Sequence, residues 1–262
     1  MATKDTAAAE NIRIWARRHE AVDALNQKDW CNQASIDLKT VCEGADLVII
    51  CAPVNRIIEL TSTISPFLST ETIVTDVGSA KTNIVKECTA ILSDQACFIG
   101  SHPMAGSEKT GMENAQSTLF NGKVCFVTPS EKSSVENVQK VSKFWEDLGS
   151  KVIVETPEKH DELTAKGSHS PHIISAALAS YLDESCPNAV DFCGNGLRDT
   201  TRIAAGDPGL WTEIIFQNRE EILKSLSDFQ IEIEKYREAI AKNDPEMTKS
   251  LLAKGKKFRD SL

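Results

Sequence analysis

Residues 46–53 read DLVIICAP, and this stretch decides the fold because its apolar residues form one unbroken run. A strand with one face in water alternates apolar and polar residues, whereas a continuous run is typical of a strand buried on both faces of a parallel sheet. Ala52-Pro53 ends the run, since proline cannot donate to a sheet ladder. Two further segments read as strands, a buried one at 71–77 (ETIVTDV) and a short apolar one at 96–100 (ACFIG).

Helical patterns separate these runs, as a parallel sheet requires. We predict strands at residues 11–17, 46–51, 71–77, 96–100, 123–128 and 151–155, with helices at 19–27, 56–68, 83–92 and 135–148. Strands that alternate with helices of this length predict an α/β fold with a doubly wound, mostly parallel, Rossmann-like sheet.

After Pro157 no strand pattern returns. Helices are expected at 159–181, interrupted near Ser170-Pro171, then at 208–242 and from Pro245 to residue 258. Apolar residues between Ile222 and Ile240 recur every three or four positions, as in a coiled-coil seam. We therefore expect an α/β nucleotide-binding domain at 1–156 and an all-helical domain at 157–262 that forms a homodimer.

Composition excludes several classes of function. The chain of 262 residues has a net charge of −9, which argues against nucleic-acid binding, since that needs a basic face. No apolar run approaches the length of a membrane span, and the N-terminus lacks a secretory signal. The eight cysteines contain no Cys-x-x-Cys pair, so we expect a reducing, cytoplasmic protein without disulfides or a metal site.

His102 is the strongest candidate for chemistry. It follows the predicted strand 96–100, and ligands bind at the carboxyl ends of strands in α/β sheets. Its imidazole can act as a base near neutral pH, and Pro103 fixes the turn after it. The alternative is a histidine that merely ends a strand and bonds to the backbone.

Other candidates would line the same crevice. In DVGSAK, residues 76–81, Ser79 could bond a ligand or only cap the following helix. Arg17-Arg18 follow the first predicted strand, where positive charge suits the 2′-phosphate of a cofactor; the alternative is a solvated charge pair. No Gly-x-Gly-x-x-Gly occurs in the sequence, which by itself counts against a dinucleotide enzyme.

The helical half offers histidines and an arginine. His169 and His172 stand three residues apart, which places them on one face of a helix. A metal site there is conceivable, but polar contacts with a ligand are favoured because no carboxylate or cysteine stands at ligand spacing. Arg202, before Ile203-Ala204-Ala205, suits bidentate capture of a carboxylate.

Taken together, the segments resemble the prephenate dehydrogenase family, with arogenate dehydrogenase as close kin. The matching segments run in family order from about Ile12 to Asn243 and read DLVIICAPV, IVTDVGSAK, GSHPMAGSEKTG, LFNGKVCFVTP, HDELTAKGSHSPH and GNGLRDTTRIAAGDPGLW. The third and the last are highly specific to that family.

The resemblance implies a reaction and a site. A hydride leaves the ring carbon that bears the hydroxyl, a histidine draws off the hydroxyl proton, and the ring carboxylate leaves as CO2, giving 4-hydroxyphenylpyruvate from prephenate. It implies catalytic roles for His102 and Ser79, and substrate contacts by His172, Arg202, Ser168 and His169. It implies a nicotinamide cofactor, which Arg17-Arg18 suggest is NADP rather than NAD, held by Arg17, Arg18, Ala52, Pro53, Asp76 and Gly78.

The sequence departs from the family pattern at its N-terminus. The family opens with a strand and a Gly-x-Gly-x-x-Gly turn, whereas only Met1–Glu10 precede the first predicted strand here. We therefore expect the first strand and the phosphate-binding turn to be missing and cofactor binding by this chain to be weak. Three alternatives follow: an arogenate dehydrogenase, another hydroxy-acid dehydrogenase with a helical domain, and a non-catalytic remnant that acts as a dimerising module.

Overall fold

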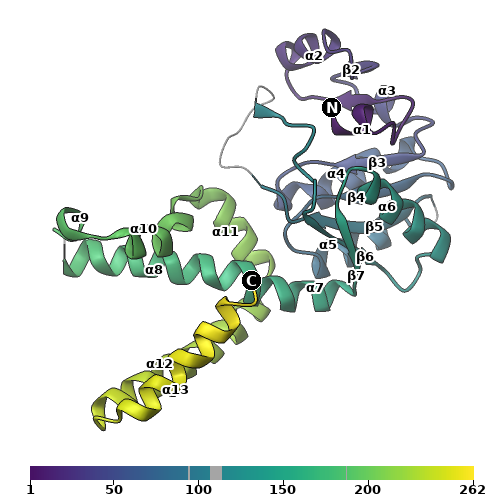
Figure 1. Cartoon of the computed structure of the whole chain (residues 1–262). Coiled ribbons are helices and arrows are strands. Elements are labelled where there is room, and N and C mark those ends of the chain that lie inside the picture. The colour runs from purple at the N-terminus through teal and green to yellow at the C-terminus, as the bar shows by residue number, and fades with distance from the viewer. Residues whose placement is uncertain (94, 107–113, 187) are drawn as a thin grey trace.

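The computed structural model describes residues 1–93, 95–106, 114–186 and 188–262 (Figure 1). The end of the GSHPMAGSEKTG segment, residues 107–111, lies outside this range. The last strand ends at Val154, and the described residues beyond it form helices. No helix in the described part of the chain is long and apolar enough to cross a membrane.

A five-stranded sheet forms the centre of the first half. Its strands lie in chain order: β3 (Leu47–Ile50), β4 (Ile73–Asp76), β5 (Cys97–Pro103), β6 (Val124–Pro129) and β7 (Lys151–Val154). Neighbouring strands are parallel except β5 and β6, which are antiparallel. This confirms the predicted α/β class with a mostly parallel sheet.

Helices cover both faces of this sheet, and its buried residues alternate between them. Val74 and Phe98 pack against α4 (Ile57–Ile64) and α5 (Thr82–Ile91). Ile73 and Ile99 pack on the other face, against α6 (Val135–Asp147). Successive side chains of a strand point to opposite faces, so a run without polar residues is what a sheet covered on both sides needs. Short 3-10 turns, η1 (Val54–Arg56) and η2 (Ser65–Phe67), flank α4.

A second sheet, of two strands, precedes the five-stranded sheet along the chain. In it β1 (Arg13–Trp15) pairs in parallel with β2 (Gln33–Ser35), and α2 (His19–Asn26) lies between them in the chain. Neither β2 nor α3 (Leu38–Cys42) was predicted, because elements this short show no periodicity. Among the described residues no strand pairs with the second edge of β1 or with the outer edge of β3. A short helix, α1 (Ala2–Asp5), precedes β1.

The helical half departs from the main body in two arms (Figure 1). Its elements are α7 (Pro157–Thr164), η4 (Ala165–His169), α8 (Ser170–Ser185), α9 (Ala189–Phe192), α10 (Asn195–Thr201), η5 (Arg202–Ala205), α11 (Pro208–Gln217), α12 (Arg219–Ala241) and α13 (Pro245–Arg259). One arm contains α8 to α11, and the other is the hairpin of α12 and α13.

Two predicted helices differ from the structure. The helix expected over 208–242 is wrong: it breaks at Asn218, whose backbone (φ −112°, ψ 32°) leaves the helical region. The expected interruption near Ser170-Pro171 falls earlier, in the π-helical turn η4. Pro171 stands just after this turn, within a helical stretch that continues from α7 through η4 into α8, so its missing N–H leaves one helical hydrogen bond unmade there.

Candidate active site

His102 lies in β5 and is only 7% exposed. The expectation that the strand stops at Gly100 is wrong. Beyond Phe98 the strand leaves β4 and pairs antiparallel with β6, which places His102 opposite Phe126. This pairing supplies the hydrogen bonds that keep residues 101–103 extended, so the histidine is held within a sheet rather than in a turn.

A second histidine, which the sequence analysis did not single out, contacts the first. His102 Nδ1 lies 2.8 Å from His160 Nε2, and His160 Nδ1 lies 2.8 Å from Asp161 Oδ1. Both partners come from α7 and are almost fully buried, at 0% and 3% exposure. Phe126 packs edge-on against His160, with ring centroids 5.0 Å apart. His102, His160 and Asp161 therefore form a continuous series of hydrogen bonds at the junction of the two halves.

Asp161 also caps the N-terminus of α5, a helix that is distant in sequence. Its carboxylate accepts hydrogen bonds from the backbone N–H groups of Lys81 (2.8 Å) and Thr82 (2.9 Å), at the start of α5. No side chain beside that helix start caps it, so the capping role considered for Ser79 is filled from the helical half instead. Ser79 stands half-buried in the turn between β4 and α5.

Asp76, expected to hold cofactor, is engaged inside the protein. Its side chain is fully buried and forms an ion pair with the equally buried Lys81. It also accepts hydrogen bonds from the backbone N–H groups of Gly78 (2.8 Å) and Ser101 (3.2 Å), and Lys81 Nζ donates to the Ser101 carbonyl (3.0 Å). Asp76 thus shapes the turn that carries Ser79 and ties it to the strand of His102.

The substrate-side histidines lie around a tryptophan. His172 stacks on Trp211, with ring centroids 3.5 Å apart and planes at 12°, and His169 approaches the same ring edge-on. His169 Nδ1 lies 3.1 Å from Asn218 Nδ2, which also donates to the Asp161 carbonyl (2.8 Å). Asn218, where the predicted long helix breaks, therefore links these histidines to the chain that ends at His102. Ser168 lies half-buried in η4, beside His169.

Arg202 stands on η5, where it is exposed. The segment is held against α8 by a hydrogen bond from Ser175 Oγ to the Thr200 carbonyl, 2.9 Å long. At its end, Gly206 touches the stacked pair: a Cβ there would lie 2.5 Å from Trp211 Nε1 and 2.9 Å from His172 Cε1. Glycine is therefore required for the close approach that brings the arginine segment to the histidines.

Burial determines the protonation state of the histidines in the site. It lowers the pKa of His102 well below its usual value, and repulsion from a proton on His160, from the charge of Lys81 and from a proton on His169 would lower it further. Burial also lowers the pKa of His160 and of His172, and it lowers the pKa of His169 to about 4. These imidazoles are neutral at pH 7, so His102 is in the form that accepts a proton.

The remaining residues expected at a cofactor lie at strand ends. Ala52 is half-buried and Pro53 exposed just after β3, next to the turn after β4, since Ile50 pairs with Asp76. Arg17-Arg18 are exposed beyond β1. The site thus gathers His102, Ser79, His169 and His172 at the junction, whereas the arginines Arg17, Arg18 and Arg202 lie at the surface.

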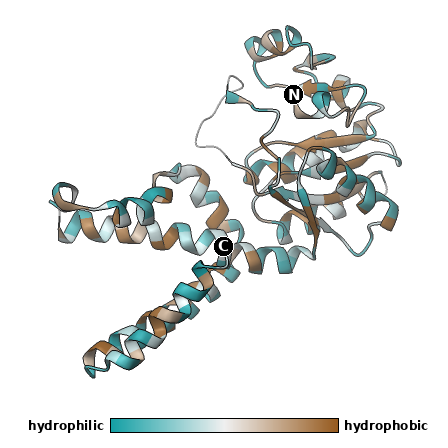
Figure 2. Cartoon of the chain, in the orientation of Figure 1, coloured by the Kyte–Doolittle hydropathy of each residue, from teal (hydrophilic) through white to brown (hydrophobic). Residues whose placement is uncertain are grey.

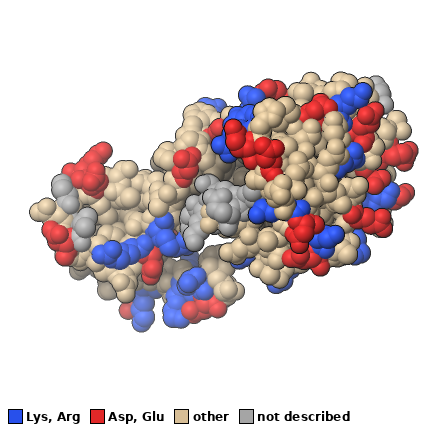
Figure 3. All heavy atoms as spheres, turned by 90° about the horizontal axis from the view of Figure 1, so that it is seen from above, with Lys and Arg blue, Asp and Glu red and all other residues tan. Residues whose placement is uncertain are grey.

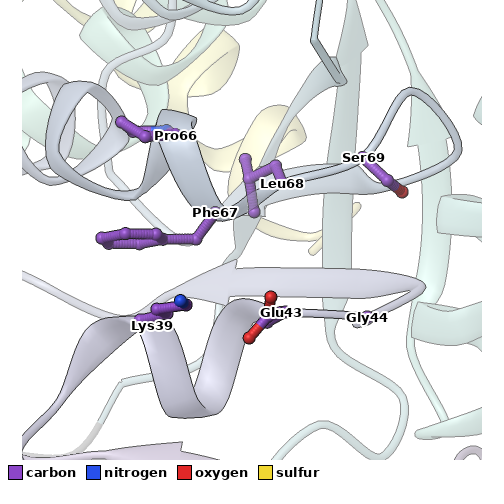
Figure 4. A pocket seen from close by; sticks show the side chains of 7 residues that line it. All are labelled: Lys39, Glu43, Gly44, Pro66, Phe67, Leu68 and Ser69. Atoms are coloured by element: carbon purple, nitrogen blue, oxygen red, sulfur yellow. The ribbon is translucent and has the colours of Figure 1, made fainter.

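Other surfaces do not coincide with this cluster. A pocket of about 430 Å³ lies between α3 and η2, lined by Lys39, Glu43, Gly44, Pro66, Phe67, Leu68 and Ser69 (Figure 4), and it includes none of the predicted site residues. On the face seen in Figure 3, acidic and basic side chains are interspersed.

Comparison with known proteins identifies the family. Residues 12–154 match the model for "Prephenate dehydrogenase, nucleotide-binding domain", and residues 156–254 match "Prephenate dehydrogenase, dimerization domain". Prephenate dehydrogenase of Bacillus subtilis is 32% identical over 93% of this chain, which spans 66% of that protein. Cyclohexadienyl dehydrogenase of Zymomonas mobilis is 30% identical over 84% of this chain, which spans 75% of that protein.

Solved structures agree with the sequence relatives. Prephenate dehydrogenase from A. aeolicus, in complex with hydroxyphenyl propionate and NAD+, superimposes with a TM-score of 0.91 at 28% identity, over 99% of this chain and 92% of that one. Synechocystis arogenate dehydrogenase gives 0.89 at 28% identity, over 99% and 94%. With both family models matched in order and relatives at 30% identity or more, the chain belongs to the prephenate dehydrogenase family.

Proposed function

We propose that this chain carries the active site of a prephenate dehydrogenase, which converts prephenate to 4-hydroxyphenylpyruvate and CO2 by hydride transfer to a nicotinamide cofactor. The observation that carries the proposal is His102, a buried, neutral imidazole held by His160 at the junction of the two halves. A non-catalytic remnant would have no use for a base kept neutral in this way.

His102 acts as the general base in this proposal. It takes the proton of the ring hydroxyl as the hydride leaves the same carbon, while the ring carboxylate departs as CO2 and the ring becomes aromatic. The bound nicotinamide supplies the acceptor for the hydride. Ser79, in the turn after β4, bonds the substrate hydroxyl or the imidazole and orients the reacting carbon.

The helical half holds the substrate. Arg202 binds a carboxylate through its planar fork, and His172, held flat against Trp211, presents its ring edge to the substrate. Ser168 and His169 complete the polar wall behind it. Prephenate and arogenate differ in a keto or an amino group on the side chain, and both remain substrates of this proposal; a cyclohexadienyl dehydrogenase and an arogenate dehydrogenase are among the relatives.

The residues present fit part of a nicotinamide dinucleotide. Ala52 is half-buried and Pro53 exposed at the end of β3, beside the buried Gly78 turn after β4, and these residues would hold the nicotinamide end. Asp76 shapes that turn from within. The glycine turn that normally holds the pyrophosphate does not occur in this sequence.

Arg17 and Arg18 favour NADP over NAD in this proposal, since two exposed guanidiniums after β1 suit a 2′-phosphate. Titrating both cofactors into the protein and into its Arg17→Ala/Arg18→Ala variant tests this. We expect the variant to lose affinity for NADP and to keep its affinity for NAD. The matched control is Arg237→Ala, an exposed arginine on α12. Tighter binding of NAD by the unaltered protein would contradict the assignment.

We further propose that residues 1–156 and 157–262 are the two domains, and that the second forms a homodimer in the cytoplasm. Apolar side chains remain exposed along both arms, among them Phe229, Ile233 and Ile240 on α12. Figure 2 shows that hydrophobic positions recur along the ribbon of both arms. Sedimentation should give a dimer at micromolar concentration and a monomer for Ile240→Asp. The control, Ile36→Asp, changes an exposed isoleucine of the first half and should stay dimeric.

Product analysis tests the function as a whole. The protein is incubated with prephenate or arogenate and with each cofactor, and the reduced nicotinamide, CO2 and aromatic product are measured. We expect all three in equal amounts with one of the two substrates. A dimeric, cofactor-binding protein that turns over neither substrate would support the remnant, and turnover of a simple hydroxy acid instead would support the third alternative.

A further inference from the structure

The hydrogen-bond chain at the junction has a direction that its chemistry fixes. Burial alone would raise the pKa of Asp161, but hydrogen bonds from His160 and Thr82 bring it below its usual value, so the group is a carboxylate. A carboxylate only accepts hydrogen bonds. His160 must therefore donate from Nδ1, the nitrogen that lies 2.8 Å from Asp161 Oδ1.

This assignment determines the next link. The pKa of His160 is lowered, so the ring is neutral and has a single N–H, which Asp161 already uses. Its Nε2 is then an acceptor, and His102 Nδ1, 2.8 Å away, has to be the donor. A neutral His102 with its proton on Nδ1 carries the lone pair on Nε2.

We propose that His160 and Asp161 are positioning residues that hold His102 in the tautomer whose Nε2 accepts the proton, and that they stabilise its imidazolium once it forms. The inference rests on the proposed function, since it assigns residues to the same proton transfer. The logic is that of a base oriented by a third group, with a second imidazole interposed. Because Asp161 also caps α5, its two roles have to be separated experimentally.

The tautomer can be read without any turnover. In protein labelled with 15N at histidine, long-range 1H–15N correlations identify which ring nitrogen of His102 carries the proton. We expect Nδ1–H in the unaltered protein and Nε2–H, or a mixture of the two, in Asp161→Asn and His160→Gln. A wild-type spectrum with Nε2–H overturns the proposal, even if the enzyme proves active. Conversely, the expected spectrum with no turnover of prephenate or arogenate would sink the proposed function alone.

Steady-state kinetics can separate the proposed positioning of His102 from the role of Asp161 in capping α5. His160→Gln leaves the carboxylate of Asp161 in place for the amides of Lys81 and Thr82, so a capping role predicts unchanged turnover. We expect kcat to fall on the order of 10²-fold in this variant and in Asp161→Asn, with KM little changed. The matched control is Asp244→Asn, which makes the same change at an aspartate that caps α13 through the Met247 N–H at 2.9 Å. Unchanged kcat in both test variants would overturn the inference.

The pH dependence of kcat in the test variants distinguishes loss of positioning from entry of water into the site. Lys81 is the positive group near His102 and is paired with Asp76, His169 is neutral near pH 7, and Asp161 adds a negative charge through His160. In Asp161→Asn, the loss of the carboxylate charge should leave the acid limb of the kcat–pH profile unchanged or move it to lower pH. A limb that moves up toward pH 6.5, the value of a solvated histidine, would mean that water had entered, and the loss of rate would then count against positioning.

Discussion

The two sides of the candidate site differ in how far one chain completes them. On the side of the base, His102, His160 and Asp161 are all buried and joined by contacts of 2.8 Å. On the other side, Arg202 stands exposed on a short 3-10 turn of an arm whose apolar side chains also face outward. In the proposed function the base is thus fixed within the fold, whereas the proposed carboxylate-binding arginine stands on an exposed arm.

The largest effect that would sharpen this contrast is on turnover. His102→Asn removes the proton acceptor and should lower kcat by roughly 10²–10⁴-fold, the usual cost of losing a general base, with little change in substrate affinity. Steady-state kinetics with the active substrate measures it. The control is His19→Asn, at an exposed histidine that begins α2. Near-normal turnover in His102→Asn would remove the base from this side of the site.

The buried histidines should also make stability depend on pH. The pKa of His169 is about 4 in the folded state, against 6.5 in the unfolded chain. Between these values the unfolded state binds the additional proton, so stability is full above about pH 6.5 and falls as the pH drops toward 4. His169 alone should cost about 3 kcal/mol by pH 4. Urea unfolding of the protein and of His169→Gln measures it, and parallel pH curves for the two would contradict it.

A smaller effect is expected where the arginine segment meets the histidines. Gly206→Ala places a methyl group against Trp211 and His172, and overpacking of this kind costs roughly 1–3 kcal/mol of unfolding free energy. Gly196→Ala, in the same segment, has no atom within 4 Å of its added Cβ and should leave stability unchanged or raise it. Thermal unfolding of both variants decides the matter, and equal midpoints would show that the contact is not tight.

The smallest effect concerns Arg202. Lysine keeps the charge but cannot form the planar fork, so Arg202→Lys should lose one charge-assisted hydrogen bond, roughly 1.5 kcal/mol, and raise KM about tenfold. Folding should be little affected, because lysine keeps the positive charge at this exposed position. Arg198→Lys, on α10, is the matched control. If KM is equal in the two variants, Arg202 has a structural role and the exposed side lacks its carboxylate clamp.

Sequence patterns predicted the sheet better than the helices. The apolar run that became β3 and the Ile-Val pair of β4 record burial on two faces, which is a local property of the chain. The length of β5 and the break at Asn218 depend on distant partners instead. β5 continues past Gly100 because β6 lies beside it, and the side chain of Asn218 bonds the Asp161 carbonyl. No periodicity encodes such contacts.

The same distinction applies to the site. His102, His169 and His172 stand out in the sequence, and the structure brings them to one junction. The partner of His102 did not stand out, because His160 follows it by 58 positions and only the fold makes them neighbours. The sole local signal was a His-Asp pair at the start of a predicted helix. A carboxylate next to an imidazole is a common way to fix a tautomer, so such a pair merits attention beside any candidate base.

The cap that Asp161 places on α5 has a mechanical consequence. One carboxylate joins the two halves and, in our proposal, orients the proton acceptor, because it holds the amides of Lys81 and Thr82 while it holds His160. A hinge rotation that parts the helical half from the sheet breaks these contacts together, and His102 loses the partner that orients it. In the proposed mechanism, the base is therefore oriented only while the helical half is held against the sheet.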